Sequence, residues 1–111
     1  MSDWQKKFDE IRLQFFGRAQ PRLVKTVETL DALAKNRGDA HSLAAIRKDM
    51  HWLAGVGGTY KLPEITQIGE TGEQLCDKFL ETAQPPPEQD LAHLRSLIAR
   101  AQAIIDAQSA E

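Results

Sequence analysis

The chain has 111 residues, 41% of them hydrophobic and 27% charged, and a formal net charge of −2. This length fits one domain that buries its own core, and the mixed charge lacks the Lys/Arg-rich block of nucleic-acid-binding proteins. No apolar run reaches the roughly 18 residues that cross a membrane, and the N-terminal residues do not resemble a signal peptide. We therefore expect one monomeric cytoplasmic domain over residues 1–111 that acts alone, without nucleic-acid or membrane partners.

The first two helical patterns are separated by residues that usually interrupt a helix. An apolar stripe with steps of three and four predicts a helix over about residues 2–16. Its members are Trp4, Phe8, Ile11 and Phe15. Gly17 and Pro21 follow, and Pro21 suits the first turn of a second helix over about residues 21–35. We expect the first helix to pack across one end of the domain or to extend one side.

Three more amphipathic helices are predicted over about residues 40–60, 63–81 and 88–108. Asp39 is placed to cap the first of them, and Pro63 suits the first turn of the second. No segment alternates like a β-strand, and the connections are short. The pattern predicts an all-α protein, an antiparallel four-helix bundle with an additional N-terminal helix. We expect residues 109–111 to be frayed.

One histidine stands off the apolar stripe of the helix predicted over residues 40–60. The stripe comprises Leu43, Ile46, Met50, Leu53, Gly57 and Tyr60. His51 lies roughly 100–130° from its middle on the helical wheel. The residues that cluster around His51 are Ala44, Arg47, Gly55 and Gly58. Because glycine in a helix costs about 1 kcal/mol relative to alanine, these glycines indicate that bulk is avoided beside the histidine.

An outward-facing histidine on a helix is a candidate nucleophile. Neutral imidazole carries a lone pair on one ring nitrogen, so it can attack an acyl phosphate and hold the phosphoryl group as a phosphoramidate. Arg47 and Lys48 lie about one turn before His51 and could offset the charge of a phosphate, or they could form an ordinary solvated face. His51 could equally have no special role, and Gly57 on the core stripe could simply permit close helix packing.

Metal and nucleotide chemistry have no matching motif in the chain. Its histidines, His41, His51 and His93, lack the spacing of a metal-ligand set. No Gly-rich phosphate-binding loop is present, so the chain has no visible means of binding ATP. Cys76 is the only cysteine, which excludes an internal disulfide, and its place beside an apolar stripe indicates a small buried hydrophobe. We expect no bound metal or cofactor.

The stretch from His51 to Tyr60, with Leu62 to Ile65 after it, resembles the signature of histidine-containing phosphotransfer (HPt) domains. In that family the pattern is His-x-Leu-x-Gly-x-x-Gly, followed by an aromatic or apolar residue. A second helix then opens near Leu-Pro-Glu and carries an acidic residue, which Glu73 matches here. The resemblance covers roughly residues 47 to 75.

The resemblance implies a four-helix bundle in which His51 is the phosphorylated residue. The domain would shuttle a phosphoryl group between aspartates of response-regulator receiver domains in a multistep phosphorelay, or receive it from a hybrid histidine kinase. It would be a phosphoryl carrier and not an enzyme, and Mg²⁺ would belong to the partner receiver. Gly55 and Gly58 would leave His51 accessible to that partner. Together with the neighbouring Ala44 and Ala54, they form the predicted docking surface.

Two positions depart from the family pattern. Ala54 stands where many members carry lysine, so Arg47 or Lys48 is expected to supply the charge near the phosphate. Lys61 stands where the family often has glycine. The hydrogen-bond partner of the imidazole is left open among polar residues of the next helix, such as Gln67, Glu73 and Gln74.

Two other functions are open on the sequence alone. The bare helix could dock a receiver domain or another signalling protein without phosphoryl transfer, although docking gives no reason for a histidine at position 51. A helical cofactor or metal bundle is the third possibility, and it lacks the ligand spacing that such bundles use.

Overall fold

The computed structural model describes residues 2–109, which form four helices and no β-strand. The helices are α1 (Asp3–Lys35), α2 (Ala40–Thr59), α3 (Pro63–Thr82) and α4 (Glu88–Ser109). The all-α prediction is confirmed, and the last three helices begin at the predicted residues. Of the tail that we expected to be frayed, Ser109 is helical, and the other two residues lie outside the described part of the chain.

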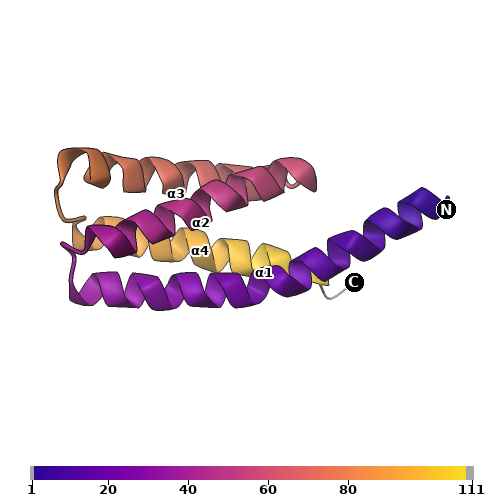
Figure 1. The fold of residues 1–111 in the computed structure, drawn as a ribbon, viewed down its shortest axis with the longest axis horizontal. Helices are drawn as coiled ribbons and strands as arrows, with labels where there is room; N and C mark the ends of the chain where they lie inside the picture. The colour runs from indigo at the N-terminus through magenta and orange to yellow at the C-terminus, as the bar shows by residue number, and fades with distance from the viewer. Residues whose placement is uncertain (1, 110–111) are drawn as a thin grey trace.

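The helices form an up-and-down bundle (Figure 1), and their buried apolar side chains make one core. Each helix packs against the next in the chain, and α4 returns to lie beside α1. All four helices contribute side chains that are buried almost completely. Among the largest of these are Leu23, Leu30, Ile46, Met50, Leu53, Ile65, Ile68, Leu94, Ile98 and Ile105. The apolar stripe of α2 is therefore inside, which leaves the adjoining face of α2 for solvent.

The prediction of an additional N-terminal helix is wrong, because α1 runs unbroken through Gly17 and Pro21. Proline removes the hydrogen bond to the carbonyl oxygen four residues earlier, which here belongs to Gly17. Both residues are exposed, so this oxygen can be hydrated instead. On the core side, the buried side chains of Phe16, Ala19 and Leu23 hold the helix through the interruption. The N-terminal part of α1 consequently extends beyond the bundle, inclined to the rest of the helix (Figure 1).

Glycines bring α2 and α3 unusually close together. A Cβ atom added to Gly69 would lie 2.8 Å from the Cα of Ala54, and one added to Gly72 would lie 2.6 Å from the Cγ of Met50. A Cβ on Gly57 would lie 2.9 Å from a backbone oxygen of the connection between the two helices. The prediction that Gly57 permits close packing is confirmed. Side chains on the facing edges of α2 and α3 can therefore reach one another.

The N-terminal end of α2 has the predicted cap, and its C-terminal end has a lysine in a conformation that favours glycine. Asp39 accepts hydrogen bonds from the backbone N–H groups of His41 and Ser42, as expected of an N-cap. At the C-terminal end, Lys61 has φ of 57°, in the left-handed region that favours glycine. The N–H of Leu62 then donates to the carbonyl oxygen of Gly57 at 2.8 Å, the bond that closes a Schellman motif.

Candidate functional site

His51 lies in the outer face of α2, and 73% of its side chain is exposed. The residues on either side of its turn, Met50 and Leu53, are fully buried in the core. The backbone that carries the imidazole is thus fixed by packing while the ring itself meets solvent. This is the placement that the helical wheel predicts for a histidine off the apolar stripe.

Glu73 of α3 makes the hydrogen bond to the imidazole. Its Oε2 lies 2.8 Å from Nδ1 of His51, and its side chain is only 20% exposed. An ionised carboxylate can only accept, so the hydrogen lies on Nδ1. Nε2, on the far side of the ring from Glu73, then carries the lone pair. The arrangement presents one nucleophilic nitrogen to solvent.

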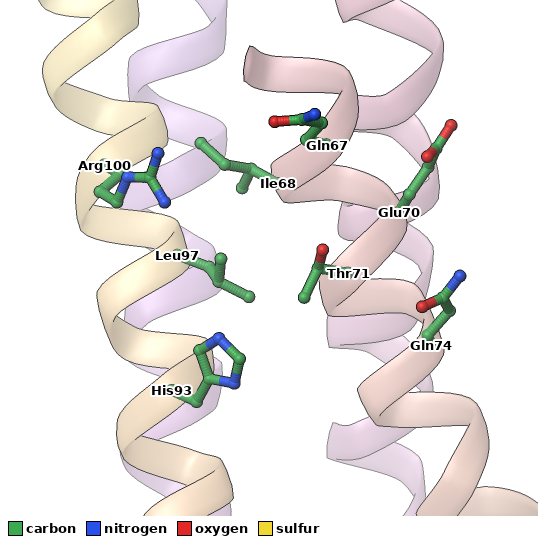
Figure 2. A pocket seen from close by; sticks show the side chains of 8 residues that line it. All are labelled: Gln67, Ile68, Glu70, Thr71, Gln74, His93, Leu97 and Arg100. Carbon is green, nitrogen blue, oxygen red and sulfur yellow. The ribbon is translucent and has the colours of Figure 1, made fainter. Parts of the chain in front are cut away.

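The two other polar candidates of α3 belong to a different surface. Gln67 and Gln74 line a pocket between α3 and α4, together with His93 and Arg100 of α4 (Figure 2). Glu73 instead lies on the edge of α3 that faces α2, where it contacts Arg47 and His51. Of the three residues that the sequence left open, Glu73 is therefore the one that contacts His51.

The two basic residues before His51 have different surroundings. The Nη2 atom of Arg47 lies 3.4 Å from Oε2 of Glu73, and its Nε donates to the carboxylate of Asp77. The hydrogen bond to Asp77, and then the charge of Asp77, raises the pKa of Arg47 above its usual value. Lys48 is exposed, and within residues 2–109 it forms no ion pair. The charge of Arg47 is therefore shared between carboxylates of α3, while that of Lys48 stays available.

The small residues predicted around His51 differ in how far they are open to solvent. A Cβ added to Gly55 or Gly58 would meet no atom within 4 Å, so the surface beside both glycines is open. Ala44 is exposed as well. Ala54 is half-buried because its backbone packs against Gly69 of α3. Ala54 thus contributes more to the contact between α2 and α3 than to the free surface.

Aromatic rings line a groove on the α1 side of His51. Phe15 stacks on Tyr60 with ring centroids 4.8 Å apart, and its centroid lies 5.6 Å from that of Trp52. His51 and Gly55 belong to the same groove. Trp52 of α2 thus packs against α1. The sequence does not assign Phe15 to this groove, because its apolar stripe predicts a separate helix over about residues 2–16.

A polar clamp fixes α1 against α2 one turn before this groove. Arg22 of α1 donates from Nε to Oδ1 of Asp49 at 3.1 Å, and the fully buried Thr26 donates to Oδ2 at 2.7 Å. The guanidinium carbon of Arg22 also lies 4.3 Å from the ring centroid of Trp52. No pattern in the sequence assigns Arg22 and Thr26 to Asp49, so this clamp follows only from the structure.

Other chemistries have little support in the described residues. Residues 2–109 contain no group of three His, Cys, Asp or Glu side chains placed to hold a metal ion. None of the helices they form is both long and apolar enough to cross a membrane. Burial raises the pKa of Cys76 to about 12, so its sulfur is held as a thiol and not as the reactive thiolate.

In a comparison with protein families, the family model of the Hpt domain matches residues 10–104. The matched segment begins within α1 and ends within α4, so it includes His51 and Glu73. No curated protein and no solved structure matches the chain.

Proposed function

Because this chain belongs to the Hpt domain family, the histidine phosphotransfer modules of two-component phosphorelays, we propose that His51 carries the phosphoryl group. Domains of this family are phosphoryl carriers without an ATP site of their own. On this proposal the donors and acceptors are aspartates of receiver domains, and a hybrid histidine kinase belongs to the same relay. The observation that carries the proposal is the pairing of an exposed imidazole with a carboxylate at its Nδ1.

This pairing suits reversible transfer through Nε2. The lone pair of Nε2 attacks the phosphorus of an aspartyl phosphate, the P–O bond breaks, and its electron pair remains on the aspartate carboxylate. The ring keeps its hydrogen on Nδ1 and gains a formal positive charge, which the carboxylate of Glu73 stabilises at 2.8 Å. Transfer onward reverses the step, because imidazole protonated on Nδ1 departs as a neutral leaving group.

The surface around His51 suits the approach of another protein. A receiver must bring its aspartate to Nε2, so the helix surface around His51 must carry small side chains. Gly55, Gly58 and Ala44 supply that clearance. The aromatic groove beside them, which includes Trp52, offers apolar area for docking. We place the interface on these residues, with α1 contributing through Phe15.

Charge support for the phosphoryl group is assigned to Lys48. Arg47 is engaged by Glu73 and Asp77, whereas Lys48 is exposed about one turn from His51. We assign the Mg²⁺ of the reaction to the receiver, as the resemblance to HPt domains implies. The chain itself then supplies the nucleophile, the carboxylate on Nδ1 and one nearby cation.

The test is transfer from a phosphorylated receiver domain to the purified protein. We expect one phosphate that is labile in acid and stable in base, as a phosphohistidine is. The variant His51→Gln should stay unlabelled yet keep its helical circular dichroism, because the side chain is exposed. Labelling that persists in His51→Gln would overturn the proposal. Receiver binding without any transfer would identify a docking module instead.

A further inference from the structure

We propose that Arg47, anchored by Asp77, is a positioning residue that holds Glu73 against Nδ1 of His51, an inference that rests on the proposed phosphoryl-carrier function. The residues come in two pairs with the same spacing. Arg47 and His51 are four residues apart on α2, and Glu73 and Asp77 are four residues apart on α3. Since side chains four apart lie on one face of a helix, the pairs face each other across the two antiparallel helices.

The contacts run in an unbroken line from Asp77 to His51. The Nε of Arg47 donates to Asp77, and its Nη2 lies 3.4 Å from Oε2 of Glu73. That same oxygen lies 2.8 Å from Nδ1 of His51. The carboxylate of Glu73 is thereby held between a guanidinium and an imidazole. A carboxylate with two fixed partners has fewer rotamers available than one with a single partner.

Arg47 is poorly placed to bind the phosphoryl group itself. Its guanidinium is directed to α3, where it meets Glu73 and Asp77, and the two carboxylates together exceed its charge. A phosphoryl group on Nε2 would lie on the opposite side of the ring from Glu73. The geometry favours an indirect role for Arg47, exerted through the carboxylate.

The expected consequence concerns the position of the ring hydrogen. While Glu73 is held at Nδ1, the hydrogen stays there and Nε2 keeps its lone pair. When Arg47 is removed, Glu73 can rotate toward solvent, and the tautomer with hydrogen on Nε2 gains population. That tautomer has no lone pair at Nε2 and cannot attack phosphorus there. Loss of Arg47 should therefore slow transfer without a change in the interface.

The experiment reads the ring directly, in the unphosphorylated full chain. ¹⁵N NMR of the His51 ring shows which nitrogen carries the hydrogen, and phosphoryl uptake from a phosphorylated receiver is timed in parallel. We expect Arg47→Ala to shift the ring toward the Nε2–H tautomer and to slow uptake about tenfold. Arg47→Lys should restore part of both. Asp77→Asn should act in the same direction as Arg47→Ala, and the double variant should equal Arg47→Ala alone, because Asp77 acts through Arg47.

Arg95→Ala is the matched control. Arg95 of α4 pairs with Asp31 at 2.8 Å, and its side chain is 46% exposed against 41% for Arg47. Neither readout should change in this variant. Unchanged ring signals in Arg47→Ala, or faster transfer, would overturn the role of Arg47. Because the NMR measurement needs no partner, it decides that role even if the unmodified chain accepts no phosphoryl group, which would instead refute the proposed function.

Discussion

The side chains of His51 and Glu73 come from two different helices and meet at 2.8 Å, and we attribute the meeting to the close helix contact at Gly69. Gly69 lies one turn before Glu73 on the same edge of α3, and its backbone packs directly on that of Ala54 in α2. Any side chain at position 69 would separate the helices. The contact makes the two ring nitrogens inequivalent, since within residues 2–109 only Nδ1 has a hydrogen-bond partner.

Replacing Glu73 by alanine should slow phosphoryl uptake by ten- to a hundredfold. A hydrogen bond to a charged group contributes about 1.5–3 kcal/mol, and each 1.4 kcal/mol is about a factor of ten. Rapid-quench measurement with a phosphorylated receiver gives the rate. Glu70→Ala is the control, because Glu70 is exposed on the same helix but lines the pocket on the α4 side. Glu73→Ala at the unmodified rate would show that the carboxylate does not assist the imidazole.

Gly55→Ala and Gly58→Ala should each stabilise the fold and slow the transfer. Each added methyl group meets no atom within 4 Å, and alanine is favoured over glycine in a helix by about 1 kcal/mol. The same methyl group stands where a receiver has to approach His51. Thermal unfolding and transfer rate, measured on the same samples, should move in these opposite senses. If a variant is more stable but transfers the phosphoryl group at the unmodified rate, the substituted glycine does not lie in the interface with the receiver.

Gly69→Ala is the contrasting variant at a buried glycine. Its added Cβ would lie 2.6 Å from the carbonyl oxygen of Met50 and 2.8 Å from the Cα of Ala54. Both are backbone atoms, so the helices have to move apart. Lower thermal stability is expected together with slower transfer, because Glu73 moves away from the imidazole.

Much of this site follows from periodicity, because burial of one face of a helix decides where the other face lies. The stripe through Met50 and Leu53 is enough to turn His51, Gly55 and Gly58 outward. The imidazole partner could not be chosen in the same way. Whether a residue of α3 reaches His51 depends on how α3 is rotated and how close it lies. Those quantities are set by tertiary contacts such as the one at Gly69.

The continuity of α1 could not be predicted from local sequence patterns for a related reason. Proline inside a helix costs about 3 kcal/mol on local grounds, so ending the first helix before Pro21 was the reasonable expectation. Burial of Phe16, Ala19 and Leu23 on the opposite side outweighs this local cost. Because α1 is continuous, Phe15 lies beside Trp52, and the groove next to His51 includes a residue that no local pattern assigns to it.

Lys48→Ala should slow phosphoryl uptake by no more than about fivefold, because an exposed charge contributes up to about 1 kcal/mol. Lys48→Glu should slow it further, since the sign of the charge is reversed. Raising the salt concentration should reduce both differences. Lys35→Ala serves as the control, being an exposed lysine in the last turn of α1. Equal rates for Lys48→Glu and the unmodified chain would show that Lys48 does not offset the charge of the phosphoryl group, and that the receiver alone supplies this support.

Lys61→Gly should stabilise the fold by about 1 kcal/mol, because a side chain in the left-handed region is strained by roughly that amount. Lys61 has φ of 57° at the end of α2. Lys61→Ala is the informative control, since it removes the long side chain but keeps the Cβ atom responsible for the strain. Only the glycine variant should raise the melting temperature. A gain of equal size in Lys61→Ala would assign the effect to charge.

Because its thiol is buried, Cys76 should lower the free energy of unfolding at alkaline pH, and Cys76→Ala should remove this pH dependence. Burial raises the pKa of its thiol from 9.0 to about 12, so between these values the folded chain keeps a proton that the unfolded chain has released. Unfolding then releases a proton, and the free energy of unfolding falls as pH rises, by at most about 1.4 kcal/mol per pH unit for this group. Cys76→Ala lacks this contribution, although it loses packing at every pH. The difference in unfolding free energy between the unmodified chain and Cys76→Ala, measured by urea titration, should therefore shrink from pH 9 upward. A difference that stays constant with pH would mean that the thiol ionises equally well in the folded chain, which its burial opposes.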